Sequence, residues 1–299
     1  MLEHLITEQR NPASEGIDSL PTRELLEVIN REDQKVAFAV QQEIPRIAEA
    51  LDAIVERFQR GGRLFYAGAG TSGRLGVLDA VECPPTFGIP TERVQALMAG
   101  GETAMFRSVE ASEDRRDAGE EDLRTRGFHS GDVLVAISAS GRTPYPLGAL
   151  AYARSLGART IGVTSNPDSP LAREADISIA PLVGPEVITG STRMKSGTAQ
   201  KLVLNMLSTG LMVKTGYVLG NLMVNLQLNS EKLIDRAQRI VAETAGCQRE
   251  RASQALVDSG NRVRVAIVMA RFDVDRAVAE QHLAEAGDNL WQALGSRGR

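Results

Sequence analysis

Two short segments of the chain concentrate glycine and hydroxyl residues directly after an apolar run and before a predicted helix. The first lies within Gly68–Arg74 and offers four candidate substrate-binding residues: Gly70, Thr71, Ser72 and Gly73. The second lies within Ser138–Thr143 and offers Ser138, Ser140, Gly141 and Thr143. Where a strand ends and a helix begins, free backbone N–H groups and hydroxyls converge on one spot that suits a phosphate. Two such segments in one domain predict a site for a phosphorylated small molecule.

Each segment also has a simpler interpretation. The first is compatible with a glycine turn whose Ser or Thr caps a helix. It also resembles a dinucleotide fingerprint, although it lacks a clear acidic residue at the end of the next strand. The second segment places three hydroxyls within six residues, whereas a helix cap needs only one, so we favour ligand binding there.

A third hydroxyl-rich stretch, Thr189–Thr198, opens a long predicted helix and contains two basic residues, Arg193 and Lys195. Positive charge at a helix N-terminus suits an anion, which makes Lys195 a candidate substrate-binding residue. A capped helix start with solvated basic side chains explains the same residues equally well.

Two carboxylates are candidates for acid–base catalysis. Glu82 precedes Cys83-Pro84-Pro85, and because residues before proline avoid the α conformation, we expect the helix to end near Glu82. The negative end of the helix dipole would raise the pKa of this carboxyl and favour the protonated form that a general acid needs. Glu113 follows Ser112, a candidate helix cap, and in the first turn of that helix its anion would be stabilised, as a base requires.

Two carboxyl groups whose pKa values are shifted in opposite directions by their surroundings are typical of an acid–base pair. The alternatives are a solvated helix end for Glu82 and an ordinary first-turn acid for Glu113. A helix that started upstream, near Thr103, would remove the argument for Glu113. Cys83 is not assigned as a nucleophile, because no histidine lies nearby in the sequence and buried cysteine is the commoner case.

Composition narrows the class of protein. The 299 residues are 42% hydrophobic and 24% charged, with a net charge of −4, which argues against a nucleic-acid partner bound by general electrostatics. No apolar stretch reaches the length that spans a membrane. The first residues lack a basic region followed by an apolar core, so we expect a cytoplasmic location. With 2 Cys and 3 His, we expect neither a disulfide framework nor a metal site.

The elements that position these residues follow a strand–helix alternation. Strands are predicted at 63–67, 94–99, 132–138, 159–164 and 176–180, with helices between them, most clearly at 144–157. Continuous apolar strands alternating with helices predict an α/β fold, a doubly wound parallel sheet of five strands covered on both faces. Ligands bind such sheets outside the carboxyl ends of the strands, where both glycine–hydroxyl segments lie.

Helices flank the predicted sheet. Thr22 is a candidate cap for a helix starting at Arg23, and a second helix is predicted from about Asp33 to Arg60. A long apolar helix over 193–216 is expected to be buried under the sheet or in a dimer interface. After about residue 229 the chain is helical, with three or four short helices over 248–295. We divide it into an N-terminal helical segment (1–60), an α/β domain (61–228) and a C-terminal helical subdomain (229–299).

The two glycine–hydroxyl segments together resemble the sugar isomerase (SIS) domain, a doubly wound fold that binds phosphosugars. Further motifs narrow the resemblance to the N-acetylmuramic acid 6-phosphate etherases, whose relatives include the glucokinase regulatory protein. These motifs occur in the right order over most of the chain. They are Thr7-Glu8-Gln9-Arg10-Asn11 with Ser14 and Ile17-Asp18, Gly68–Gly76, Glu82-Cys83-Pro84-Pro85, and Ala199–Thr209.

The resemblance implies a lyase of cell-wall recycling that splits the lactyl ether of N-acetylmuramic acid 6-phosphate into N-acetylglucosamine 6-phosphate and D-lactate. It implies Glu82 as the proton donor, Glu113 as the base, and no metal or organic cofactor. It also implies a homodimer and a C-terminal unit similar to a ubiquitin-associated three-helix domain. Two alternatives stay open: a phosphosugar isomerase, whose flanking signature is not Glu-Cys-Pro-Pro, and a non-catalytic phosphosugar sensor, which would lose the carboxylate pair.

Overall fold

The computed structural model describes residues 5–109, 111–226, 228 and 230–295. The chain forms two compact units: Met1–Val81 with Glu92–Ser208, and Glu82–Thr91 with Thr209–Arg299. In this division the N-terminal helices are counted with the α/β unit, and the longer stretch of the second unit begins at Thr209, within a continuous helix.

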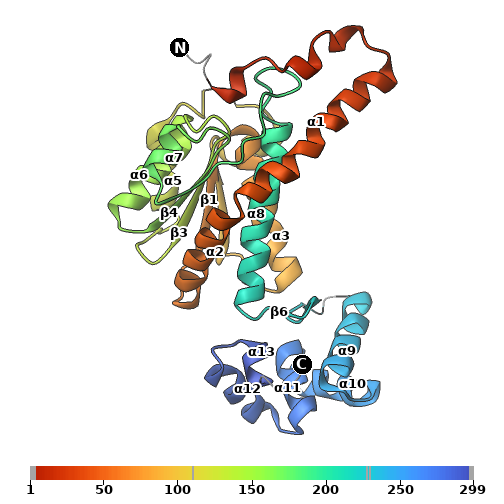
Figure 1. Cartoon of the computed structure of the whole chain (residues 1–299). Helices are drawn as coiled ribbons and strands as arrows, with labels where there is room; N and C mark the ends of the chain where they lie inside the picture. The colour runs from red at the N-terminus through yellow and green to blue at the C-terminus, as the bar shows by residue number, and fades with distance from the viewer. Residues whose placement is uncertain (1–4, 110, 227, 229, 296–299) are drawn as a thin grey trace. The chain divides into compact units, whose positions relative to one another are not determined.

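The first unit is built on five parallel strands in the order β2-β1-β3-β4-β5 (Figure 1). The five predicted strands and the doubly wound sheet are thereby confirmed. Gly68 at the end of β1 is in register with Ile137 at the end of β3, so the two glycine–hydroxyl segments leave neighbouring strands at one edge. The strands are β1 Leu64–Gly68, β2 Val94–Met98, β3 Val133–Ile137, β4 Arg159–Val163 and β5 Ile177–Ile179.

Helices cover both faces of this sheet (Figure 1). Phe65 and Leu134 share a core with Leu123 and Leu150 of the helices on one face. On the other face Gly76 lies so close to Tyr66 that an added Cβ would stand 3.0 Å from the tyrosine Cβ. The first face carries α5 Arg116–Thr125, α6 Pro144–Ser155 and α7 Pro170–Glu174, and the second carries α2 Ile44–Gln59, α3 Gly70–Phe87 and α8 Lys195–Lys214.

The N-terminal segment begins with 3-10 turns at Ile6–Glu8, Pro12–Ser14 and Ile17–Ser19, which lead into α1 Thr22–Gln42. Thr22 is the first helical residue rather than the predicted cap, and Pro21 stands at the cap position. The predicted start of a second helix at Asp33 is wrong, because α1 continues to Gln42. The break falls at Glu43, ahead of Pro45, since buried Val36 and Val40 extend the apolar face of α1.

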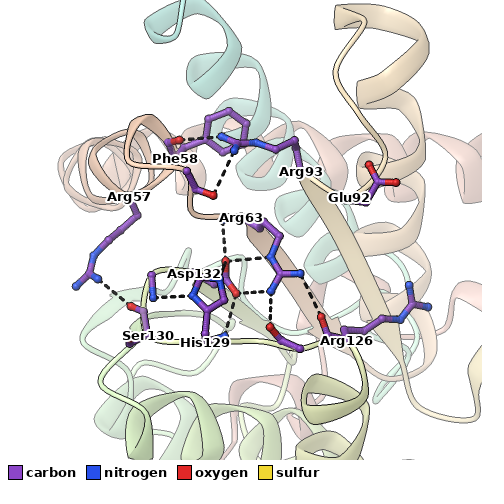
Figure 2. A network of polar contacts seen from close by, with 12 residues as sticks. Arg57, Phe58, Arg63, Glu92, Arg93, Arg126, His129, Ser130 and Asp132 are labelled. Atoms are coloured by element: carbon purple, nitrogen blue, oxygen red, sulfur yellow. Dashed lines mark hydrogen bonds and ion pairs between the residues drawn. The ribbon is translucent and has the colours of Figure 1, made fainter. Parts of the chain in front are cut away.

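The amino-terminal edge of the sheet is tied by a buried ion pair (Figure 2). Asp132 is fully buried and its carboxylate accepts from Arg63 Nη2 at 2.7 Å and from the Arg63 backbone N–H at 2.9 Å. The Arg63 guanidinium also donates to the carbonyl oxygens of Arg126 and Gly127. These bonds join the starts of β1 and β3 on the side opposite the glycine–hydroxyl segments.

The second unit is helical, as predicted, apart from a short hairpin of β6 Val218–Leu219 and β7 Leu222–Met223. It has its own core, which includes fully buried Val241, Ile267 and Leu290. Over the described residues, no helix has both the length and the apolarity to cross a membrane. The helices of the second unit are α9 Glu231–Ala245, α10 Arg249–Asp258, α11 Val263–Phe272, α12 Arg276–Glu285 and α13 Leu290–Ala293.

Candidate active site

The first glycine–hydroxyl segment turns directly from β1 into α3, whose first residue is Gly70. The turn is tight, because a Cβ on Gly73 would lie 2.7 Å from the Gly68 carbonyl oxygen and 2.8 Å from Met98 Cγ. Thr71 is half-buried and Ser72 is buried. The first turn of α3, with Thr71 and Ser72, therefore lies at the carboxyl end of β1, where the N–H groups of a helix start suit an anion.

The second segment forms a cluster of hydroxyls. Ser138 Oγ lies 2.9 Å from Thr143 Oγ1 and 3.4 Å from Ser140 Oγ, and it accepts from the Gly141 N–H at 3.1 Å. Gly141 has a φ of +66°, and a Cβ there would stand 2.0 Å from Ser169 Oγ, so no larger residue fits. Half-buried Ser140 and Thr143 keep hydroxyls at the surface of a turn that is already ordered.

Two residues that were not predicted from the sequence hold this turn by hydrogen bonds to its backbone. Thr164 Oγ1 and Asn166 Nδ2 donate to the Ala139 carbonyl oxygen at 3.2 Å and 2.9 Å. Asn166 also accepts from the Ile6 N–H at 3.0 Å, which attaches the N-terminal segment to the same edge. The signal available in the sequence was the polar run Thr164-Ser165-Asn166 directly after an apolar strand.

Carboxylates of the chain itself bind the start of α8 and Lys195, which remains only a predicted substrate-binding residue. Glu186 is fully buried and accepts from the N–H groups of Lys195 and Ser196 at 2.9 Å each. The Lys195 ammonium is buried and lies 2.7 Å from Glu32 Oε2. Glu186 thus caps the start of α8, and the Lys195–Glu32 pair fixes α8 against α1.

The N-terminal motif takes part in the same hydrogen-bond network. Asn11 Nδ2 donates to Glu32 Oε2 at 2.9 Å and to the Pro185 carbonyl oxygen at 3.0 Å, and Ser14 Oγ donates to the Val187 carbonyl oxygen at 2.7 Å. Burial acts to raise the pKa of Glu32, but hydrogen bonds from Lys195, Lys35 and Asn11 outweigh it and lower that pKa to about 2. The motif thus binds the segment that leads into α8.

Glu113 lies in an exposed turn ahead of α5, not in its first turn. The helix starts at Arg116, and the Ser112 hydroxyl donates to the Val109 carbonyl oxygen instead of capping it. The predicted cap is wrong because the Glu113 carbonyl is already used: it accepts from the Tyr145 N–H at 3.0 Å. Tyr145 is in the first turn of α6, two residues after Thr143, so Glu113 is brought beside the second hydroxyl segment.

Arg74 supports the stretch that leads to Glu113. Its Nη2 and Nε donate to the carbonyl oxygens of Ala104 and Met105 at 2.7 Å and 3.1 Å. These carbonyls belong to the last turn of α4, Gly101–Phe106. Arg74 thereby joins the first turns of α3 to the segment that carries the candidate base.

Glu82 lies inside α3 and not at its end. The helix continues through Pro84 and Pro85 to Phe87, so the expectation that the prolines stop it is wrong, and the argument from the negative helix end no longer applies. Burial of Cys83 and Phe87 stabilises the last turn despite the missing N–H groups. Glu82 is exposed and belongs to the part of α3 counted with the second unit.

A buried carboxylate anchors α3 one turn before Glu82. Asp79 accepts from Tyr66 Oη at 2.8 Å, from Asn205 Nδ2 at 2.6 Å and from Ser208 Oγ at 3.0 Å. Asn205 and Ser208 lie in the Ala199–Thr209 motif, so part of that motif serves to join α8, α3 and β1. In the described ranges, no three His, Cys, Asp or Glu side chains gather as metal ligands would.

Comparisons with known proteins agree with this geometry. The SIS domain model matches residues 124–210, and the model of the glucokinase regulatory protein N-terminal SIS domain matches residues 46–154. A Bacteroides fragilis protein, proposed to be a phosphosugar isomerase involved in capsule formation, is similar in structure with a TM-score of 0.50. It is 27% identical, over 66% of this chain and 94% of its own. The fold and the two hydroxyl segments thus define a SIS-domain protein.

Full-length relatives narrow the class further. The N-acetylmuramic acid 6-phosphate etherase of Pasteurella multocida is 55% identical over 290 residues, which cover 97% of this chain and 96% of its own. The protein of that name from Clostridium botulinum is 54% identical over 293 residues, covering 98% and 97% of the two chains. The chain belongs to the N-acetylmuramic acid 6-phosphate etherase family.

Proposed function

We propose that this protein is a carbon–oxygen lyase that cleaves the lactyl ether of N-acetylmuramic acid 6-phosphate, giving N-acetylglucosamine 6-phosphate and D-lactate in cell-wall recycling. The observation that carries the proposal is 55% identity over 97% of the chain with a protein of that name. The presence of both Glu82 and Glu113 favours a catalyst over a phosphosugar sensor.

The phosphate is proposed to bind at the two hydroxyl segments. Ser72, Ser140 and Thr143 supply hydroxyl donors, and the first turn of α3 supplies N–H groups. No arginine or lysine is needed, because oriented backbone dipoles favour an anion at a helix start. A sugar phosphate is charged and stays in the compartment in which it is phosphorylated, so we place the enzyme in the cytoplasm.

Glu113 is proposed as the base because it stands beside the second hydroxyl segment. It removes the C2 proton next to the C1 aldehyde of the open-chain sugar. The electron pair forms the C2–C3 double bond while the C3–O bond to lactate breaks, and Glu82 protonates the departing lactate oxygen. Water then adds its hydroxyl to C3 and a proton returns to C2, so the balance consumes one water and needs no redox partner. Such proton transfers each contribute about 10²–10⁴-fold to the rate.

Glu82 is proposed to act from a second copy of the chain in a homodimer. Glu82 is counted with the second unit, whereas both hydroxyl segments belong to the first. The neighbouring side chains Leu78 and Val81 are 47% and 56% exposed and offer an apolar surface that a second copy would cover.

The reaction is tested by incubating the protein with N-acetylmuramic acid 6-phosphate and measuring D-lactate. Glu82→Gln and Glu113→Gln should each lower kcat by about 10²-fold or more, with a smaller effect on KM. Glu56→Gln, in an exposed pair with Arg60, is the matched control and should leave both constants unchanged. Isomerised sugar phosphate without lactate would support the isomerase alternative instead.

The shared site is tested by combining the two inactive variants in one dimer. If Glu82 reaches the partner's loops, a dimer of one Glu82→Gln chain and one Glu113→Gln chain has one intact site and one doubly altered site. Heterodimers purified by two different tags should therefore regain activity. Heterodimers as inactive as both parents would show that each chain uses its own Glu82.

A further inference from the structure

Several buried polar side-chain atoms of the described residues have no hydrogen-bond partner. Within the described part of the chain, buried side-chain atoms lack a hydrogen-bond partner in Ser165, Ser196, Gln200 and Thr244. The first three belong to the α/β unit. Gln200 stands out because neither Nε2 nor Oε1 has a partner and the residue is only 2% exposed. Burying an amide without hydrogen bonds costs free energy, so a position of this kind points to a ligand that completes it.

The position of Gln200 is fixed by the contact between α8 and the first glycine–hydroxyl segment. A Cβ on Gly197 would lie 3.3 Å from Thr71 Cγ2 and 3.9 Å from Leu75 Cδ1. Gln200 is three residues further along α8 than Gly197, so it lies on the side of the helix close to this contact, and Ser196 is one helical turn before Gln200. The orphaned carboxamide and hydroxyl are therefore near the loop that is proposed to bind the phosphate.

Gln200 also stands at one end of an apolar stripe on α8. The residues that follow it at helical spacing, Val203, Leu204 and Leu207, are all fully buried. A leucine at position 200 would continue this stripe without any unpaired polar atom. Packing alone therefore gives no reason for a glutamine at the end of the stripe nearest the phosphate loop.

The chemistry of the two side chains selects the kind of group they would bind. A carboxamide offers one acceptor and two donors, and a hydroxyl offers both functions. A phosphate only accepts, which would leave Gln200 Oε1 unpaired. An acetamido group matches instead, because its N–H can donate to Oε1 while its carbonyl accepts from Nε2. The adjacent Lys195 is neutralised by Glu32, so the surroundings add no net attraction for an anion.

We propose that Gln200, assisted by Ser196, binds the acetamido group of the amino-sugar substrate and selects N-acetylated over free-amine sugars. The proposal rests on the proposed function, in which the hydroxyl segments take the phosphate of the same molecule. A free amine is protonated at neutral pH and cannot accept from Nε2, so Gln200 discriminates against it.

The experiment measures binding of N-acetylglucosamine 6-phosphate and of glucosamine 6-phosphate by titration calorimetry. Wild-type protein should bind the N-acetylated sugar more tightly. Gln200→Leu should weaken that binding by about 10- to 100-fold, the effect of two hydrogen bonds, and remove most of the preference. Its unfolding temperature should be unchanged or higher, because an orphaned polar group is replaced by an apolar one. Ser196→Ala should act in the same direction with a smaller change.

Thr244→Val is the matched control, since it removes another buried unpartnered hydroxyl, one in the second unit. It should leave both affinities unchanged. A Gln200→Leu protein that keeps the wild-type preference, or one that loses stability with unaltered affinities, would overturn the proposal and leave Gln200 a structural residue. Gln200→Met serves the same test if the leucine variant does not fold. Absence of D-lactate release by the wild type would count against the reaction and not against this binding role.

Discussion

At the scale of single residues, Glu32 shows how strongly the surroundings of a side chain govern its titration. Its folded pKa of about 2 lies below the ordinary value of 4.5, so its contribution to stability is present above about pH 4.5 and is lost as pH falls toward 2. The shift corresponds to about 3 kcal/mol in the free energy of unfolding. Glu32→Gln should therefore be less stable than wild type at pH 7, and this difference should shrink as pH falls below 4.

The measurement is chemical denaturation of both proteins between pH 7 and pH 3. Glu24→Gln, which alters an exposed acid in the first turn of the same helix, should show a small difference with little pH dependence. A stability gap between wild type and Glu32→Gln that stays constant across this range would contradict the assigned role of the Glu32–Lys195 pair.

At the scale of elements, the close approach of β1 and α3 makes Gly73 the most constrained position of the first glycine–hydroxyl segment. A methyl group there would stand less than 3 Å from the Gly68 carbonyl and from Met98. Gly73→Ala should lower the free energy of unfolding by about 1–3 kcal/mol and weaken binding of inorganic phosphate, because the first turn of α3 must move. Gly197→Ala, whose new Cβ would be 3.3 Å from Thr71, should cost less. Equal stability and phosphate affinity in wild type and Gly73→Ala would contradict this.

The elements also show what could be predicted from the sequence. The sheet could be predicted because runs such as Leu64–Ala67 and Val133–Ile137 are apolar throughout, and only burial on both faces accounts for that. Helix ends were less predictable, because contacts distant in sequence decide them. The Tyr145 N–H donates to the Glu113 carbonyl oxygen, and α5 begins only at Arg116. Burial of Phe87 stabilises the last turn of α3, which continues beyond Pro84 and Pro85.

The candidate site likewise contains residues that a local motif points to and residues that no local motif points to. The hydroxyl segments and both glutamates have local motifs, so they could be proposed as site residues from the sequence. Asn166 binds Ile6 and Ala139, which are far from it in the sequence, and Gln200 is distinguished by the absence of a partner, so no local pattern records either. The basic character of Lys195 is visible in the sequence, but its burial against Glu32 is not.

At the scale of the whole molecule, two separate cores predict two regions of separate stability. Ile267 is fully buried in the core of the second unit and Leu134 in that of the first. Replacing a buried Ile or Leu by Ala costs about 2–5 kcal/mol, so Ile267→Ala should speed amide hydrogen exchange in α9 to α12 and leave β1 and β3 protected. Leu134→Ala should do the reverse. α3 and α8 contribute residues to both units, so exchange near Phe87 and Lys214 should respond to Ile267→Ala, while the amino-terminal turns of both helices keep their protection. Loss of protection throughout the sheet in Ile267→Ala would instead show that the chain unfolds as one cooperative body.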